Sequence, residues 1–253
     1  MGGALARAVA SGKCEVYLSD HSKEKAEALA VAISATPCSN NEIASDCDII
    51  FLGVKPNVIG AVCEGIKDAL SKNKGATVVT MAAGVEISKL EDILGKSRAI
   101  IRIMPNTPAS VGRGMITWCK NGAVSDGDAF RFAVLLSPAG KLDLIPEGLI
   151  DAASAVAGCG PAFVYMFAEA LADGGVKCGL PRDKAMTYAA ETLIGAAEMI
   201  KQTGKHPGQL KDEVCSPGGS TIEGVHALED GAFRSLAANA VIAAFEKTKK
   251  LGK

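Results

Sequence analysis

The stretch D-I-I-F-L-G at Asp48–Gly53 decides the fold, because it is a nearly continuous apolar run of strand length that ends in glycine. Two further runs of this kind follow at Ala76–Met81 and Ala99–Met104. Helical patterns at Asn57–Leu70 and Glu86–Leu94 separate the three runs. Strands that are apolar on both faces and alternate with helices are typical of a parallel sheet that is covered on both sides. The sequence therefore predicts an α/β fold for this part of the chain.

The N-terminal residues indicate the inside of a Rossmann-type dinucleotide-binding unit. We expect a helix at Gly3–Ala10, a strand at Glu15–Ser19 and a helix at Ser22–Ile33 with Ser22 as its N-cap. In such a unit the first helix follows a strand and a G-x-G-x-x-G turn. Only Gly2 and Gly3 of that turn are present. We therefore expect this sequence to lack the first strand, which normally lies in the middle of the sheet.

The pattern changes after Pro146, where strand signals give way to Ala, Leu and Met at helical spacing as far as Lys250. We predict a dinucleotide-binding domain at residues 1–145 and an all-helical domain at residues 146–253. Helices rich in small residues, such as Phe163–Asp173 and Pro181–Gln202, suit a dimer interface, and an intramolecular bundle fits the pattern almost as well. Helix breaks are expected at Gly158–Pro161, Gly179–Pro181, His206–Pro207 and Pro217–Gly219.

Composition excludes several classes of partner. The chain has 253 residues, of which 48% are hydrophobic and 22% charged, and a net charge of −1, so a basic surface for nucleic acid is not expected. No apolar run of membrane-spanning length and no signal peptide stands out, which favours the cytoplasm. The eight cysteines form no C-x-x-C pair and there are only three histidines, so we expect reduced thiols and no metal site.

Candidate binding residues follow the ends of the predicted strands. Gly53–Pro56, Met81–Gly84 and Met104–Pro108 each come directly after a strand, where open α/β sheets bind ligands. Any one of these segments is equally an ordinary turn, but three together predict a small crevice lined by backbone. Asp20 follows the Glu15–Ser19 strand, where an acidic side chain accepts hydrogen bonds from the adenosine ribose of NAD; a turn or cap role is as compatible with the pattern. Nearby Ser19 also offers a phosphate a hydrogen-bond donor.

The loop S-P-G-G-S-T at Ser216–Thr221 is the strongest candidate for an anion site. Gly218 and Gly219 allow backbone N–H groups to approach an anion, and the helix expected to begin near Thr221 adds free N–H groups and the positive end of its dipole. A carboxylate in this position gains charge-assisted hydrogen bonds. The alternative is a capping loop in which Ser220 or Thr221 serves as the N-cap.

With further motifs, the chain resembles pyrroline-5-carboxylate reductase from Met1 to the C-terminal lysines. The motifs that carry the resemblance are A-G-C-G-P-A-F at Ala157–Phe163, A-D-G-G-V-K-C-G-L-P-R at Ala172–Arg182, H-P-G-Q-L-K-D at His206–Asp212 and the Ser216–Thr221 loop. The resemblance implies a Rossmann-type domain joined to a helical dimerisation domain, and a homodimer that can assemble further into a decamer. It also implies that NADPH or NADH reduces 1-pyrroline-5-carboxylate to L-proline.

The resemblance also implies roles for individual residues. Thr221 is similar to the family threonine that hydrogen-bonds the ring nitrogen and counts as the catalytic residue, while Val214 borders the ring. Because a protonated cyclic imine accepts a hydride readily, the main task is positioning, and no strong acid is required. The implied substrate-binding residues are Val214, Ser216, Gly218, Gly219, Ser220 and Thr221. The implied cofactor-binding residues are Ser19, Asp20, Asn40, Gly53, Val54, Lys55, Pro56, Ala82, Ala83, Gly84, Asn106, Thr107 and Pro108.

Departures from the family pattern keep alternatives open. Asp20 shifts the expectation toward NADH, and the incomplete glycine turn puts pyrophosphate binding by this chain in doubt. Cys159 and Cys215 stand where small hydroxyl residues are usual, and we interpret both as small-residue replacements. A related hydroxyacid dehydrogenase, which would use a lysine such as Lys177 or Lys184, and a non-catalytic truncated homologue are the competing hypotheses.

Overall fold

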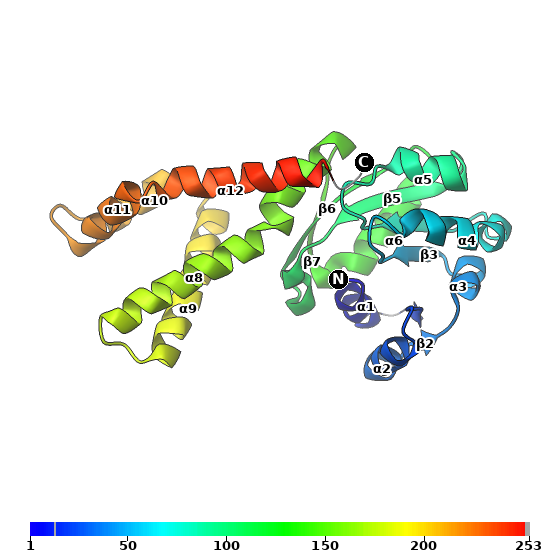
Figure 1. The fold of residues 1–253 in the computed structure, drawn as a ribbon, viewed down its shortest axis with the longest axis horizontal. Helices are drawn as coiled ribbons and strands as arrows, with labels where there is room; N and C mark the ends of the chain where they lie inside the picture. Colours follow the sequence, from blue (N-terminus) through cyan, green and yellow to red (C-terminus); the bar gives the residue numbers. More distant parts are fainter. Residues whose placement is uncertain (13, 251–253) are drawn as a thin grey trace. The chain divides into compact units, whose positions relative to one another are not determined.

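The computed structural model describes residues 1–12 and 14–250 and divides into two compact units (Figure 1). The first unit comprises Met1–Cys159 together with the residues from Ala243 onward, and the second comprises Gly160–Ile242. The predicted domain boundary lies between residues 145 and 146. The units divide later because residues 147–159 pack against the sheet, where the side chain of Ile150 is fully buried.

The five-stranded sheet of the first unit has the order β3-β4-β5-β6-β7. Strands β3 (Ile49–Leu52), β4 (Thr77–Thr80) and β5 (Ala99–Met104) are parallel, and they confirm the three strands predicted from apolar runs. Strand β6 (Gly114–Lys120) pairs with β5 in the antiparallel direction, and β7 (Gly140–Leu144) runs parallel to β6. These last two strands were not predicted.

The N-terminal strands form a separate small sheet. Strand β1 (Tyr17–Leu18) pairs in parallel with β2 (Thr36–Pro37), and among the described residues no strand joins this pair to the larger sheet. Helix α1 (Gly2–Ala10) and helix α2 (Lys23–Ile33) agree with the prediction, and the Ser22 hydroxyl accepts a hydrogen bond from the N–H group of Lys25.

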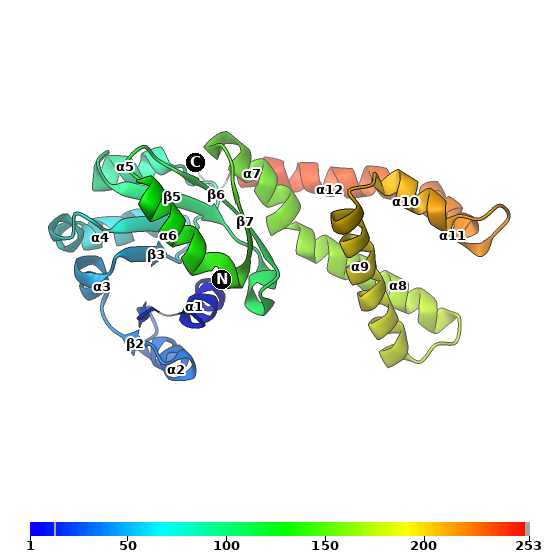
Figure 2. The ribbon, with the colours of Figure 1, turned by 180° about the vertical axis from the view of Figure 1, so that it is seen from behind.

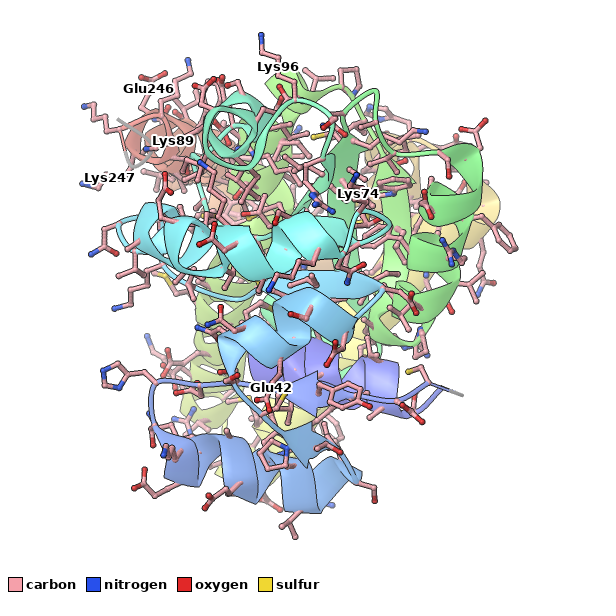
Figure 3. The ribbon with its side chains drawn as sticks, turned by 90° about the vertical axis from the view of Figure 1, so that its right-hand side faces the viewer. Glu42, Lys74, Lys89, Lys96, Glu246 and Lys247 are labelled. Carbon is pink, nitrogen blue, oxygen red and sulfur yellow. The ribbon has the colours of Figure 1, made fainter. Side chains whose placement is uncertain are left out.

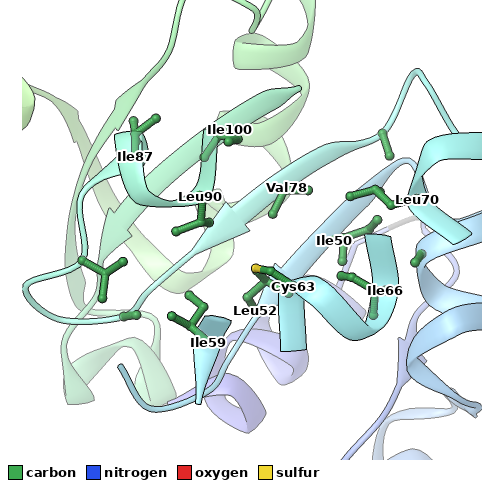
Figure 4. Packing of buried hydrophobic residues seen from close by; sticks show 14 of the residues in the cluster. Ile50, Leu52, Ile59, Cys63, Ile66, Leu70, Val78, Ile87, Leu90 and Ile100 are labelled. Carbon is green, nitrogen blue, oxygen red and sulfur yellow. The ribbon is translucent and has the colours of Figure 1, made fainter. Parts of the chain in front are cut away.

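Helices cover both faces of the larger sheet. On one face, α4 (Ile59–Lys72) and α5 (Ile87–Leu94) pack against β3, β4 and β5 (Figures 1 and 4). On the other face lie α1 and α6 (Asp126–Leu136), and Figure 2 shows α6 in front of the sheet. Alternate residues of one strand belong to the two layers: Val78 packs in the first and Val79 in the second. This confirms the predicted sheet with two apolar faces.

A buried arginine joins the sheet to the helices that follow it. Arg102 on β5 has a side chain only 1% exposed, and its Nη2 atom lies 2.6 Å from the Oδ1 atom of Asp151. Its Nη1 atom lies 3.3 Å from the Oε1 atom of Glu147, which also accepts a hydrogen bond of 2.7 Å from the N–H group of Ile87 at the start of α5. The cluster therefore connects β5, α5, η3 (Glu147–Leu149) and α7 (Ile150–Ala153). Other charged side chains, such as Lys74, Lys89 and Lys96, lie on the outside (Figure 3).

The second unit is all-helical, as predicted. Its elements are α8 (Gly160–Lys177), α9 (Arg182–Thr203), α10 (Pro207–Val214), α11 (Ser220–Asp230) and the first part of α12 (Phe233–Thr248). Among the described residues of this unit, the buried hydrophobic ones are only the three alanines Ala172, Ala185 and Ala189. Large apolar side chains are instead exposed, among them Met166 (70%) and Leu236 (63%). Within one chain, this unit has almost no core of its own.

The predicted helix break at Gly158–Pro161 is limited to one residue. Cys159 is a turn residue between the π-helical turn η4 (Ser154–Gly158) and α8, but its backbone keeps helical angles, and Pro161 is tolerated because it lies in the first turn of α8. By length and composition alone, the helical segment Glu147–Lys177, which contains an 18-residue window with a mean hydropathy of 1.4, is apolar enough to cross a membrane. The expectation that no apolar run reaches this length is therefore wrong for this segment.

The Arg102 cluster yields a prediction about stability. Replacing Arg102 with methionine keeps most of the buried volume but leaves Glu147 and Asp151 without their cation. We expect the free energy of unfolding to fall by about 3 kcal/mol, because breaking a buried ion pair leaves charges without compensation. The measurement is urea denaturation at one fixed protein concentration.

The matched control is Lys67→Met, which removes an exposed ion pair with Glu64 at 3.8 Å on α4. This variant should change stability by less than about 0.5 kcal/mol. Equal midpoints for the two variants would contradict a structural role for the Arg102 cluster.

Candidate functional site

Three predicted loops meet at one edge of the large sheet. Strands β3, β4 and β5 are parallel neighbours, so their carboxyl ends point to the same edge. Residues 53–56, 82–84 and 106–108 follow these three ends in turn. The structure therefore brings together the segments that the sequence placed at separate strand ends, as expected for a ligand site in an open α/β sheet.

Glycines let the backbone of α1 approach this edge. A Cβ atom added to Gly53 would lie 3.5 Å from the Cα atom of Gly2, and one added to Gly2 would lie 3.8 Å from the Cα atom of Gly53. Helix α1 thus begins beside the carboxyl end of β3, and its N-cap, Met1, provides no side-chain hydrogen bond. The start of a helix without a side-chain cap offers N–H groups and a positive dipole end to an anion such as a phosphate.

The segment after β4 is a tight turn of small residues. The N–H group of Val85 donates to the Ala82 carbonyl at 3.3 Å, and Gly84 has a φ of 72°, which favours glycine. The N–H group of Ala82 donates to the buried hydroxyl of Thr80 at 3.3 Å. The turn is therefore fixed from inside and exposes backbone rather than large side chains at the edge.

The segment after β5 combines one buried and one exposed polar residue. Asn106 is 7% exposed, and its side chain is engaged inside the protein: Oδ1 accepts from the N–H group of Met115 and Nδ2 donates to the Ala157 carbonyl, each at 2.9 Å. Thr107 is exposed and Pro108 is half-buried. Contacts from Asn106 to a cofactor would therefore have to use its backbone.

Asp20 and Asn40 lie on exposed turns next to the small sheet. The Oδ1 atom of Asp20 accepts a hydrogen bond of 2.9 Å from the N–H group of Ser22, so this residue does form the turn that was the alternative interpretation. Asn40 opens helix α3 (Asn40–Asp46), where Ser39 and Glu42 form a capping box, and hydrogen bonds from Ser39 lower the pKa of Glu42. Asn40 also borders an open groove lined by Ser39, Asn40, Asn41, Val58, Ala61, Val62, Gly65 and Ile66.

The loop at Ser216–Thr221 adopts a defined turn in the second unit. The N–H group of Gly219 donates to the Ser216 carbonyl at 3.0 Å, with Pro217 and Gly218 between them. Gly218 has a φ of 67°, and this arrangement is that of a type II turn, which favours Pro followed by Gly. A Cβ atom on Gly219 would lie 2.4 Å from the Oγ atom of Ser216 and 3.2 Å from its carbonyl oxygen, so a side chain at this position requires the Ser216 hydroxyl to move.

Helix α11 begins directly after this turn. Its first residue is Ser220 and its N-cap is Gly219, with no side-chain hydrogen bond at the cap. The alternative in which Ser220 or Thr221 caps the helix is therefore not observed. The first N–H groups of α11 face the exposed loop, which also carries the exposed Thr221, and Val214 before the loop is 65% exposed. This is the geometry of an anion site built from backbone.

The remaining candidate groups have structural roles. The Nδ1 atom of His206 accepts from the N–H group of Gly208 and caps α10. Burial raises the pKa of the Cys63 and Cys119 thiols to about 11, so both remain protonated at neutral pH. Cys159 and Cys215 are half-buried free thiols. In the described part of the chain, no group of three or more His, Cys, Asp or Glu side chains is placed to hold a metal ion.

Sequence reasoning missed two contacts at these sites. It named Gly2 and Gly53 without predicting that they touch, because the packing of a helix against a strand end depends on the tertiary fold. It treated Asn106 only as a neighbour of the cofactor, whereas its carboxamide bonds Ala157. A signal for the second contact was present: Pro161 lies four residues after Ala157 and cannot donate a helical hydrogen bond to it.

Comparisons with known proteins match both units. The family model described as pyrroline-5-carboxylate reductase dimerisation matches residues 147–251, and the model described as NADP oxidoreductase coenzyme F420-dependent matches residues 1–84. The chain is 44% identical over 213 residues to the pyrroline-5-carboxylate reductase of Glycine max, covering 84% of this chain and 77% of that protein. It is 43% identical to the enzyme of the same name from Escherichia coli, covering 85% and 79%.

The solved structures agree with the sequence matches. The pyrroline carboxylate reductase of Plasmodium falciparum with NADP bound superposes with a TM-score of 0.88 at 36% identity, covering all of this chain (100%) and 95% of that chain. The strand-end loops and the Ser216–Thr221 turn thus belong to a fold shared over both units with proteins of this one name. On its fold and on these identities, the chain belongs to the pyrroline-5-carboxylate reductase family.

Proposed function

We propose that the protein reduces 1-pyrroline-5-carboxylate to L-proline with a hydride from NADPH or NADH. The observation that carries the proposal is the Ser216–Thr221 turn, whose two glycines and uncapped helix start form a backbone site for a small carboxylate. Family membership supports the same reaction, since relatives at 43–44% identity carry the name of this activity.

The residues at the sheet edge fit a dinucleotide. The close approach of Gly2 and Gly53 leaves a backbone-lined surface that a side chain would fill, and the start of α1 offers N–H groups to a phosphate. The segments that would hold the cofactor are Gly53–Pro56, Ala82–Gly84 and Asn106–Pro108, with Ser19, Asp20 and Asn40 on the adenosine side. Once bound, the nicotinamide supplies the hydride. The protein binds and orients it.

The substrate carboxylate would bind at the start of α11. The N–H groups of Ser220 and Thr221, in the first turn of α11, have no helical acceptors of their own, and a carboxylate there forms charge-assisted hydrogen bonds. No cationic side chain is required, because the helix dipole contributes part of the positive charge. Fixing the carboxylate also fixes the ring beyond it, which converts binding energy into orientation.

The Thr221 hydroxyl would hold the ring nitrogen. A hydroxyl both donates and accepts, so it can remain hydrogen-bonded to the nitrogen before and after the hydride reaches the neighbouring carbon. Because a threonine is a very weak acid, it stabilises and relays rather than protonates. An imine that enters already protonated needs no further acid, in keeping with a loop that carries no His or carboxylate pair.

The exposed apolar surface of the second unit favours dimerisation. Its apolar side chains are largely exposed in the single chain, and the family model that matches residues 147–251 is one of dimerisation. We propose that a second copy covers this surface, that dimers assemble further into a decamer, and that the enzyme acts in the cytoplasm. The same pairing would remove the apolar face of Glu147–Lys177 from water without a membrane, and no nucleic-acid partner is proposed.

The first test is oxidation of NADPH and of NADH by the 253-residue chain with and without pyrroline-5-carboxylate. We expect turnover that depends on the substrate, and we expect Asp20→Asn to raise kcat/KM for NADPH relative to NADH by about tenfold, because it removes a charge that repels the 2′-phosphate. Absence of substrate-dependent turnover with either coenzyme would reject the proposed activity for this chain.

Thr221→Val should lower kcat by about 10- to 100-fold without abolishing activity, because a hydrogen bond to the ring nitrogen is lost while the backbone clamp remains. Thr221→Ser should retain most of the activity. The matched control is Thr187→Val on α9, whose hydroxyl bonds its own helix at the Asp183 carbonyl and should not affect kcat. A Thr221→Val enzyme with unchanged kcat would contradict the role of the hydroxyl.

Gly219→Ala should raise KM for pyrroline-5-carboxylate by at least about tenfold, because its Cβ atom collides with the Ser216 hydroxyl and displaces the turn. The double variant Ser216→Ala/Gly219→Ala should recover part of the loss, since it removes the atom that is hit. Gly224→Ala, further along α11, meets nothing within 4 Å and serves as the control. If Gly219→Ala and Gly224→Ala behave alike in steady-state kinetics, the loop does not bind the substrate.

A further inference from the structure

Pro161 removes a helical hydrogen bond at the point where the second unit begins. In an α-helix, residue 161 would donate its N–H to the carbonyl of residue 157, and proline has no N–H to donate. The helix widens just before this point, where the N–H of Cys159 reaches back five residues to the Ser154 carbonyl at 3.0 Å. The Ala157 carbonyl therefore needs a donor from outside its own helix.

Asn106 supplies that donor. Its Nδ2 atom lies 2.9 Å from the Ala157 carbonyl oxygen, across 51 residues of sequence. Ala157 is half-buried, and a carbonyl that is shielded from water without a donor costs free energy, so this side-chain bond replaces the one that Pro161 cannot make. The pairing explains why a helix can continue through Gly158–Pro161 although the local sequence reads as a break.

The other end of the same carboxamide completes the sheet. Strands β5 and β6 pair with Met104 opposite Thr117, and continuing this register by two residues places Asn106 opposite Met115. The Oδ1 atom of Asn106 accepts from the Met115 N–H at 2.9 Å and so extends the ladder by a side chain. With both ends bonded and only 7% of the residue exposed, the carboxamide has one orientation.

The two hydrogen bonds of the Asn106 carboxamide, here called the Asn106 clamp, lie next to the candidate cofactor site. The residue directly precedes η1 (Thr107–Val111), whose first two residues are candidate nicotinamide neighbours. Ala157 lies two residues before Cys159, where the first unit ends, and α8 follows. One side chain thus fixes the cofactor-side turn, the end of the sheet ladder and the last turn before the substrate-binding unit.

We propose that Asn106 is a positioning residue: its carboxamide, bonded to Ala157 and Met115, holds the turn at Thr107–Pro108 in place for hydride transfer, and this carboxamide contacts neither substrate nor cofactor. The structural role of Asn106 is argued from its contacts alone. Its effect on hydride transfer rests on the function proposed above. Asparagine is required because aspartate lacks the donor for Ala157, and leucine of similar size lacks both donor and acceptor.

The test is a double-mutant cycle with Asn106→Asp and Pro161→Ala. Asn106→Asp should lower kcat at least tenfold and raise KM for the coenzyme, while KM for pyrroline-5-carboxylate stays within twofold. Pro161→Ala returns an N–H to the Ala157 carbonyl, so the loss of kcat caused by Asn106→Asp should shrink at least fivefold in the Pro161→Ala background. An identical loss in both backgrounds would overturn the link through Ala157.

The control is Asn121→Asp, which makes the same change at the opposite end of the same strand pair. Asn121 is also bonded at both ends, accepting from the Ile100 N–H at 3.1 Å and donating to the Arg98 carbonyl at 2.8 Å. It should lower the midpoint of urea unfolding at least as much as Asn106→Asp and leave kcat and both KM values within twofold. If the two aspartate variants lose kcat equally, Asn106 is structural only.

Amide hydrogen exchange tests the hydrogen bonds of Asn106 without relying on enzyme activity. In Asn106→Leu, exchange at the Met115 N–H should accelerate at least tenfold relative to its neighbours in β6, because its acceptor is removed. Unchanged protection would overturn the proposed contact. If the wild-type chain has no reductase activity, the proposed function fails while this readout still decides whether the clamp exists.

Discussion

The first unit depends on one constraint, namely that the parallel strands β3, β4 and β5 are apolar on both faces. A strand such as β4, with Val78 in one layer and Val79 in the other, cannot leave either face in water. The chain must therefore cross from strand to strand through covering helices, and all three parallel strands end at the same edge. At that edge the chain turns from strand to helix, which is why small residues and backbone groups gather there.

Local patterns predicted the elements that this constraint controls, and missed those that depend on distant partners. The three apolar strands, α1, α2, α4 and α5 were found within about two residues, because each has a clear hydrophobic pattern, and α2 also has the capping residue Ser22. The antiparallel strand β6 and the bridging role of Asn106 were missed, since both are set by pairing across the sheet. At the site, glycines marked the turns, but the contact of Gly2 with Gly53 and that of Gly219 with Ser216 required the fold.

The second unit shows that hydropathy alone does not reveal what covers an exposed apolar surface. Its buried side chains are alanines, while residues such as Met166 and Leu236 face outward. Hydropathy over Glu147–Lys177 reports only that the segment prefers a nonpolar environment, which a lipid bilayer and a second copy of the chain both provide. The same unit also carries the polar turn at Ser216–Thr221 and the exposed ion pair of Arg182 with Asp173, so hydropathy of one helix does not describe the whole unit.

The two candidate binding regions share a feature that a search for titratable residues does not find. Both lie where a glycine packs closely against its neighbour, Gly53 beside Gly2 and Gly219 beside Ser216, at the start of a helix that has no side-chain cap. Backbone N–H groups do not ionise near neutral pH, so their capacity to donate hydrogen bonds does not change with pH. For a substrate that enters already protonated, this is sufficient: the protein has to place an anion and a ring against a hydride donor. The rate is then expected to depend on the residues that hold this backbone in place, together with the Thr221 hydroxyl.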